Sequence, residues 1–221
     1  MQHFLGNRAF FLLLFLCMSF HFLPRSLHEL LGVLVLAPFF FHLWRYRGWW
    51  CALLQGRTLK GPAGKAASLL NLLLVVLMAA VIGSGIMLSN YLFKDLLPLA
   101  WRVSITAQQV HKSLCFALWL VTGLHLGLHL PALLHRRLQS AAGRRLAVGA
   151  ALLLSALGIY GAFLHRIGDR LLLKHIFATP ALKGGPVVYL GGLLAVFCLY
   201  MTAGWLVQWL CTGRKDKKNE G

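Results

Sequence analysis

The sequence predicts an all-α integral membrane protein with six transmembrane helices, four of which form a bundle. Hydrophobic residues make up 59% of the chain and charged residues only 12%, with a mean hydropathy of +0.72. A soluble domain carries about a quarter charged residues. The net charge of +17 comes from cations in short blocks between apolar segments. That pattern is typical of membrane proteins, in which basic loop residues set the orientation of the helices and contact anionic lipid. It argues against nucleic-acid binding.

The apolar segments are long enough to cross a bilayer as helices. In chain order they cover residues 8–23, 27–45, 67–90, 107–133, 146–164 and 187–211. The first segment has no small-x-small cleavage site after it, so we expect a retained helix and not a signal peptide. Pro24 and Arg25 separate it from the second segment. There Ser26-x-x-Glu29 matches a capping box, which predicts that Glu29 caps the start of the second helix.

The distribution of Lys and Arg orients the six segments. The ends and loops on one side hold 14 of these residues, and those on the other side hold 8. By the positive-inside rule both termini are expected in the cytoplasm. We expect residues 1–135 to form a four-helix bundle of two helical-hairpin repeats. Residues 136–211 would then form a third hairpin that packs on the bundle or offers a partner surface, and residues 212–221 a basic cytoplasmic tail.

Two histidine pairs have the same spacing. His28 and His42 lie fourteen residues apart in one apolar segment, as do His111 and His125 in another. On a helix this spacing puts both histidines of a pair on nearly the same face, about 21 Å apart. The order helix, outer loop, histidine helix occurs twice, beginning near Asn7 and near Asn71. The two histidine helices should therefore run parallel, so that His28 faces His111 and His42 faces His125.

The surroundings of these pairs favour haem over a bare metal ion. Zinc or copper transport would need carboxylates, thiolates or methionines converging on one site, and the spans offer almost none. The five cysteines are scattered without a Cys-x-x-Cys motif, which excludes a covalent c-type haem and a thiolate cluster. Haem b needs one histidine from each of two facing helices, small residues beside the porphyrin and cations near the propionates. The candidates for these supporting roles are Gly32, Gly85, Gly123, Arg25, Arg102 and Lys112, with Arg45 and Arg136 on the inner side.

His129 is an alternative inner ligand, because it lies one turn beyond His125 on the same helix face. Eighteen residues from His111 are five full turns, but the pair would then span about 27 Å. Symmetry with the first pair favours His125, and we expect His129 to contact a propionate or the backbone at the cytoplasmic edge. His21 is expected to be a hydrogen-bonded structural residue. His165 and His175, with Asp169, are expected in a solvated outer loop.

These motifs resemble the di-haem cytochrome b module of respiratory quinol-oxidising complexes over roughly residues 7–135. They are also similar to a group of small prokaryotic membrane proteins of cytochrome b type. The repeats of that group pair an Asn-led helix ending in Ser-Gly-Ile with a helix bearing His-Glu-x-x-Gly or His-x-x-x-His. Here the first repeat has Ser19-Phe20-His21 in place of Ser-Gly-Ile. The matching residues are Asn71, Ser84-Gly85-Ile86, His28-Glu29-Leu30-Leu31-Gly32 and His125-Leu126-Gly127-Leu128-His129.

The resemblance implies haem ligation by the four paired histidines and electron transfer across the membrane. Two histidines on each iron leave no open position, so we expect electron relay and no oxygen chemistry at iron. No Gly-x-Gly-x-x-Gly stretch is present to hold NAD or FAD. The expected partners are the lipid bilayer and either a redox subunit or a quinone. The alternatives are a ferric-reductase-like or superoxide-handling oxidoreductase with an exposed haem edge, and a haem-free transporter or membrane assembly factor.

Overall fold

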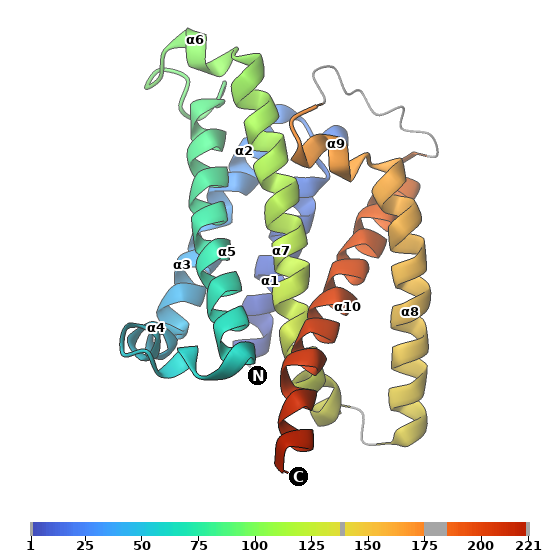
Figure 1. The fold of residues 1–221 in the computed structure, drawn as a ribbon. Helices are drawn as coiled ribbons and strands as arrows, with labels where there is room; N and C mark the ends of the chain where they lie inside the picture. Colours follow the sequence, from blue (N-terminus) through green and yellow to red (C-terminus); the bar gives the residue numbers. More distant parts are fainter. Residues whose placement is uncertain (1, 138–139, 175–184, 220–221) are drawn as a thin grey trace.

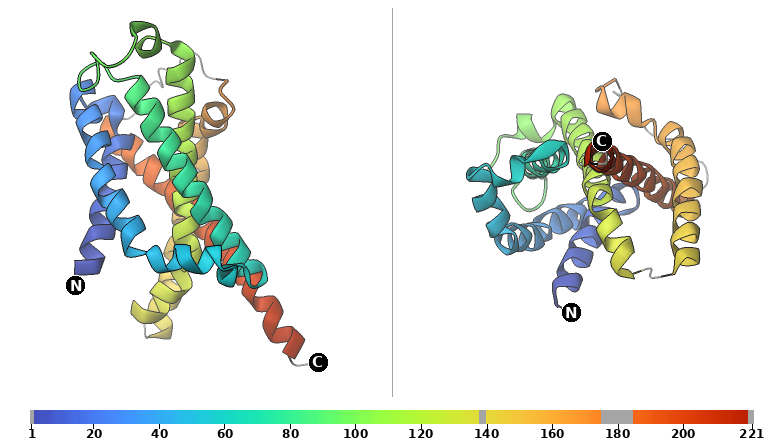
Figure 2. Two further views of the ribbon diagram at one scale, coloured as in Figure 1. Left: turned by 90° about the vertical axis from the view of Figure 1, so that its left-hand side faces the viewer. Right: turned by 60° about the horizontal axis from the view of Figure 1, so that its bottom comes forward.

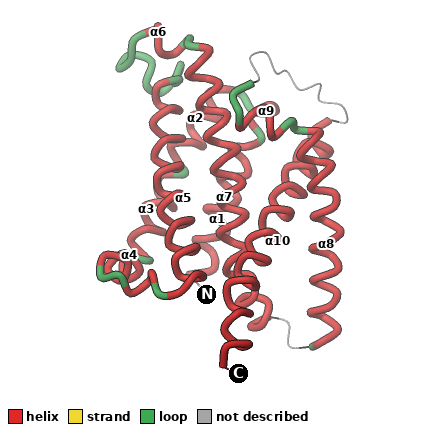
Figure 3. The backbone as a smooth tube through the Cα atoms, in the orientation of Figure 1, coloured by secondary structure: helices red, strands yellow, loops and turns green. Residues whose placement is uncertain are grey.

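The computed structural model describes the backbone of residues 2–137, 140–174 and 185–219, and the side chains of 7–131, 140–174 and 185–212. This part of the chain is helical and contains no strand (Figure 3). The short 3₁₀ segments are η1 (Phe20–Phe22) and η2 (Arg57–Leu59). The α-helices are α1 (Gln2–Met18), α2 (Arg25–Leu34), α3 (Leu36–Arg45), α4 (Arg47–Leu54), α5 (Gly61–Met87), α6 (Leu99–Arg102), α7 (Ile105–Arg137), α8 (Ala141–Leu164), α9 (Ile167–Leu171) and α10 (Gly185–Asn219).

The predicted all-helical class is confirmed, and five helical segments of the described residues, against six predicted spans, are long and apolar enough to cross a membrane. They are Arg25–Arg45, Gly61–Met87, Ile105–Pro131, Ala141–Leu164 and Gly185–Thr212. The first predicted span corresponds to α1, whose apolar part, Asn7–Met18, is shorter. α10 continues through Asn219, so residues 212–219 of the predicted basic tail are helical.

The predicted helix over 27–45 consists of two helices, α2 and α3, which meet at Val35. Pro38 explains the break, because its ring prevents a regular helix from continuing through this position. Proline is tolerated in the first turn of α3, where the missing N–H group would have no helical acceptor. The backbone stays hydrogen-bonded across the junction, with Phe39 N donating to the Val35 carbonyl at 3.1 Å. The pair therefore crosses the bundle as one bent unit that carries His28 above the junction and His42 below it.

The arrangement of the helices follows the predicted repeat. In Figure 1, α2 and α3 descend in the same direction as α7, whereas α1 and α5 ascend. The two histidine helices are therefore parallel. The beginning of α1 and the end of α10 lie at the same end of the bundle (Figures 1 and 2).

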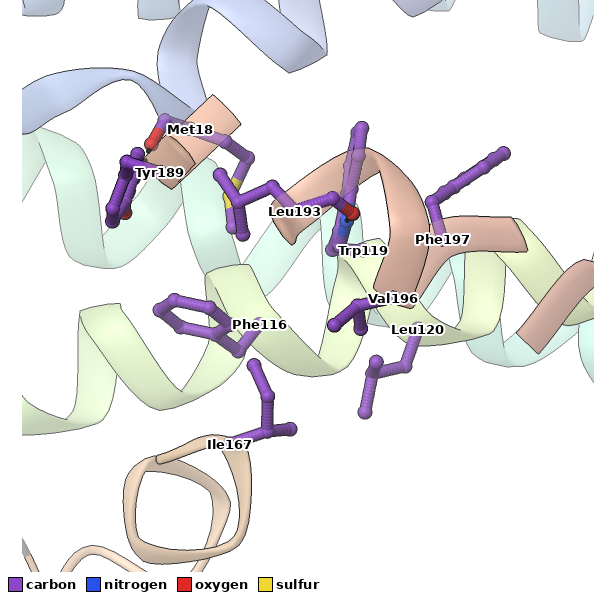
Figure 4. Packing of buried hydrophobic residues seen from close by; sticks show 9 residues of the cluster. All are labelled: Met18, Phe116, Trp119, Leu120, Ile167, Tyr189, Leu193, Val196 and Phe197. Carbon is purple, nitrogen blue, oxygen red and sulfur yellow. Dashed lines mark hydrogen bonds between the residues drawn. The ribbon is translucent and has the colours of Figure 1, made fainter. Parts of the chain in front are cut away.

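α7 lies at the centre of the fold and joins the third hairpin to the bundle. The right-hand view in Figure 2 places α10 between α7 and α8. Trp119 of α7 is 2% exposed and donates from Nε1 to the Leu193 carbonyl of α10 at 3.1 Å. Phe11 and Phe15 of α1 stack against the same indole, with ring centres 5.6 and 5.9 Å away. The largest buried cluster, drawn in Figure 4, thus combines α1, α7, α9 and α10.

Glycines allow α7 and α10 to approach closely. A Cβ atom at Gly127 would overlap the Met201 carbonyl, and one at Gly204 would overlap the Leu124 carbonyl. Without an aqueous driving force between helices, small residues at the contact let backbones pack against each other. Gly158 of α8 meets the Ala195 carbonyl of α10 in the same way.

Replacing Gly127 by leucine should force α7 and α10 apart and destabilise the protein by about 1–3 kcal/mol, the usual cost of overpacking. Gly149→Leu is the matched control, since a side chain at Gly149 of α8 would meet nothing within 4 Å. Thermal unfolding of both variants in detergent measures the difference. Equal melting temperatures for the two variants would contradict the proposed close contact.

Candidate functional site

The outer histidine pair comes together as predicted. His28 of α2 and His111 of α7 have ring centres 6.5 Å apart, with ring planes at 86°. A metal–imidazole bond is about 2 Å long and the ring centre lies about 1 Å behind the nitrogen, so two trans imidazoles on one metal have centres roughly 6 Å apart. The separation of these two rings therefore suits a single shared metal ion.

The hydroxyl of Ser84 determines which nitrogen of His111 is available. Ser84 Oγ lies 2.9 Å from His111 Nδ1 and 2.7 Å from the Ala80 carbonyl. A hydroxyl has one proton, so Ser84 donates to the carbonyl and accepts from the Nδ1–H group of His111. This hydrogen bond favours the tautomer with its lone pair on Nε2 and the Nδ1 proton held by a neighbouring group. The thiol of Cys115 lies 3.6 Å from this Nε2, a weak contact that a metal ion would replace.

Two of the predicted small residues leave room beside the outer pair. A Cβ atom at Gly85 would lie 3.2 Å from Cε1 of His111, so a side chain at this position would crowd the imidazole and force it to move by a few tenths of an ångström. A Cβ atom at Gly32, one turn after His28, would meet nothing within 4 Å. Gly85 thus admits the ligand ring, and Gly32 borders open space.

The inner pair is arranged differently. His42 Nδ1 lies 3.3 Å from Asn7 Oδ1, and its ring centre lies 4.6 Å from that of Tyr46. Because the amide oxygen only accepts, His42 donates from Nδ1 and keeps its Nε2 lone pair free. His125 is close enough to His42 and His129 for electrostatic interaction. The rings of His125 and His129 are in edge contact at 4.9 Å, and His129 is exposed at the rim.

One histidine of each pair has an unsatisfied nitrogen. Nδ1 of His28 and Nδ1 of His125 are buried and have no hydrogen-bond partner among the described residues. A buried polar atom without a partner costs free energy that a ligand or a bound group can recover. These orphaned nitrogens lie in the two places where the histidine spacing predicts a bound cofactor.

The predicted cations lie at both ends of the bundle. Arg25 begins α2 and Lys112 follows His111; both are exposed. Arg102 lies in α6, and its Nε atom is buried without a hydrogen-bond partner in the described part of the chain. Arg45 is exposed at the end of α3. The side chain of Arg136 lies outside the described residues.

Gly123 has a different role from the predicted one. A Cβ atom at Gly123 would lie 3.0 Å from Tyr200 Cβ and 3.1 Å from the Phe197 carbonyl, both on α10. Its small size therefore serves the packing of two helices. The expectation failed because Gly123 and His125 are two residues apart, and two residues turn a helix through about 200°.

The predicted capping role of Glu29 is wrong. The residue that precedes α2 is Pro24, and no side chain caps this helix. The carboxylate of Glu29 accepts hydrogen bonds from residues 89–92, in the loop after α5. The three-residue spacing from Ser26 to Glu29 matched the capping pattern, but a loop about sixty residues away binds the carboxylate instead.

A buried polar cluster at the outer end was not predicted. His165, expected in a solvated loop, is 2% exposed, and its ring centre lies 4.7 Å from that of Tyr189. Arg170 donates from Nε to the His165 carbonyl at 2.8 Å and lies 4.7 Å over the ring of Phe116. Burial, with the positive charge of Arg170, lowers the pKa of His165 to about 4, so this imidazole is neutral at pH 7.

The expectation of a solvated loop failed for His165 because α9 folds back onto α7 and buries this corner. Asp169 is ion-paired with Arg166 at 2.7 Å, and His175 lies outside the described residues. His21 contacts Tyr189 at 5.2 Å, but its buried Nε2 has no hydrogen bond among the described residues, contrary to expectation. Arg170 follows Asp169 directly, so the local sequence does not mark this corner as buried.

Comparisons of the chain with protein-family models, curated proteins and solved structures gave no match. The described side chains also contain no group of three or more His, Cys, Asp or Glu residues that could hold a metal ion. The paired histidines are therefore the strongest candidate site that the geometry offers.

Ser84→Ala should shift His111 toward the other tautomer, because it removes the acceptor of the Nδ1 proton. A hydrogen bond of about 1 kcal/mol corresponds to a several-fold change in the tautomer ratio. The ¹⁵N chemical shifts of labelled histidine in purified protein report this ratio. Ser155→Ala is the control, since Ser155 also donates to the carbonyl four residues earlier, at 2.7 Å, and its other bond is to Thr202. An unchanged His111 spectrum would refute the assigned donor.

Proposed function

We propose that this protein is a di-haem b-type cytochrome that carries electrons across a bacterial inner membrane. The observation that carries the proposal is the outer pair, where His28 and His111 face each other at 6.5 Å from two parallel helices. In this proposal one haem lies between His28 and His111 and the second between His42 and His125.

The ligand set fits haem better than a bare ion. The described residues contain no group of three or more His, Cys, Asp or Glu side chains arranged to hold a metal ion by themselves. The nearest further donors are Cys115, whose Sγ lies 3.6 Å from Nε2 of His111, and His129 beside His125. Haem supplies four iron ligands itself, so two histidines complete the coordination. The unpartnered Nδ1 atoms of His28 and His125 and the space at Gly32 support the same assignment. When bound, each haem would provide a one-electron redox centre.

The other predicted residues take supporting roles. Ser84 and Asn7 hold the Nδ1 protons of one histidine in each pair, and Gly85 makes room for His111. Cations would neutralise the haem carboxylates, as charged groups near an apolar interior need a counter-charge. At the outer edge these are Arg25, Arg102 and Lys112, and at the inner edge Arg45 and Arg136. His129 would contact a propionate or the backbone at the inner edge as a hydrogen-bonding group.

The two sites would together form a path across the membrane. The fourteen residues between the histidines of a pair correspond to about 21 Å along a helix, a large part of the roughly 30 Å hydrocarbon layer. With α1 as the first of six crossings, both termini would lie on the cytoplasmic side, where the cations are more numerous. A redox subunit or a quinone at either edge would complete the path. Coordination by two histidines favours relay over chemistry with oxygen.

Purified protein should contain about two haem b groups per chain, as measured by the pyridine haemochrome assay. His28→Ala and His125→Ala should each reduce the content to about one, since each variant removes a ligand from one site. His129→Ala is the matched control and should retain both. A content near zero in the folded wild-type protein would refute the haem proposal, and loss of one haem only in His129→Ala would move the inner ligand by one turn.

Electron transfer itself can be measured in liposomes with an impermeant reductant inside and an impermeant oxidant outside. The protein should accelerate oxidation of the trapped reductant. His28→Ala and His111→Ala should abolish this acceleration and leave the inner haem reducible, because they interrupt the path at its outer end. Transfer that persists in both variants would exclude the outer site from the path.

A further inference from the structure

Glu29 is the only acidic residue within the five candidate membrane spans. It follows His28 directly, and its carboxylate accepts four hydrogen bonds from one short segment. Ser89 Oγ donates to Oε2 at 2.7 Å and the Asn90 amide to Oε1 at 2.8 Å. The amides of Tyr91 and Leu92 both donate to Oε2 at 3.1 Å. These donors lie 60 to 63 residues after Glu29 in the sequence, so the contact joins two distant elements.

The geometry of the segment explains its affinity for a carboxylate. The amides of residues 90–92 are consecutive and converge on one group, an arrangement that binds anions through backbone dipoles. Ser89 also accepts a hydrogen bond from the Phe93 amide at 2.9 Å, which fixes the turn. Ser89 is 2% exposed, so the contact is partly shielded from solvent. Hydrogen bonds to a charged acceptor are about twice as strong as neutral ones.

The segment from Ser84 to Leu92 contacts one histidine of the outer pair and the sequence neighbour of the other. At its beginning, Ser84 holds Nδ1 of His111 at 2.9 Å. A few residues later, Ser89 and the following amides hold Glu29, which follows His28 directly. The end of α5 and the turn after it therefore connect α7, which carries His111, to α2, which carries His28.

We propose that Glu29 is a positioning residue of the outer site. Together with Ser89 and the amides of residues 90–92 it forms a clasp that holds α2 against the end of α5, and so keeps His28 opposite His111 at the separation that suits a shared metal. The positioning role rests on the proposed haem function, whereas the clasp does not. Preorganisation of this kind is what holds binding groups within about 0.5 Å of a productive geometry.

Among the described residues, the clasp occurs only beside His28, the outer histidine of the first repeat, and has no counterpart beside His111 in the second. Lys112 stands 83 residues after Glu29, the same offset that relates His111 to His28 and His125 to His42. The second repeat thus has a cation where the first has the carboxylate. The chain between α1 and α2 is also only a few residues long, so it contains no counterpart of the 89–92 turn.

The test compares Glu29→Ala and Glu29→Gln with Asp95→Asn, which removes an exposed carboxylate from the same loop. Hydrogen exchange of the amides of residues 90–92, followed by mass spectrometry, reports the clasp directly. Optical and electron paramagnetic resonance spectra of the haem-containing protein report the outer site. We expect at least about tenfold faster exchange in Glu29→Ala, because three amides lose their charged acceptor. Glu29→Gln should lie between it and the wild type, since one amide oxygen still accepts.

In the same variants the outer haem should lose low-spin character while the inner haem and the Asp95→Asn protein stay unchanged. Unchanged exchange in Glu29→Ala would overturn the clasp. Faster exchange with an unaltered low-spin outer haem would show that Glu29 holds the loop only, and would overturn its positioning role. Absence of haem from every variant and from the wild type would instead overturn the proposed function, and with it the positioning role, while the exchange result would still decide the clasp.

Discussion

The need to satisfy polar groups in an apolar interior governs the rest of this structure. A histidine within a membrane span needs partners for both ring nitrogens, because lipid provides none. Ser84 supplies one for His111, and Asn7 supplies one for His42. The remaining buried nitrogens at His28 and His125 have none among the described residues. The side chains of the bundle therefore provide hydrogen-bond partners for only some of the histidine nitrogens. This is expected of a protein that binds a further polar group between its helices.

The two repeats meet this requirement at opposite ends. In the first repeat Asn7 bonds to the inner histidine, and Phe20 contacts His28 at 6.2 Å. In the second repeat Ser84 bonds to the outer histidine, and Asn71 Oδ1 is buried without a described partner. The inserted chain between α5 and α7 adds the turn that binds Glu29, so the outer pair is held by more contacts than the inner one.

Features set by local helix geometry could be predicted from the sequence, and features set by distant contacts could not. The fourteen-residue spacing and the repeat order were enough to place His28 opposite His111 on parallel helices. Glu29 satisfied a local capping pattern, but its partners lie in a loop that only the tertiary fold brings near. His165 was expected in solvent, because nothing in its own segment reveals that α9 folds onto α7. Gly123 was assigned to the wrong face because its nearness to His125 in sequence was given more weight than the helix rotation between them.

That rotation also explains why a hairpin without paired histidines belongs to the fold. Gly123 and Gly127 lie two residues on either side of His125, about 200° around α7, so the glycines and the histidine occupy opposite faces. The glycine face is covered by α10 at backbone contact, and Trp119 fixes the same helix to Leu193. A helix that presents ligands on one face needs support on the other, since small movements of α7 would change the His28–His111 separation. The third hairpin supplies this support, which gives residues 141–212 a structural role in the candidate site without any ligand of their own.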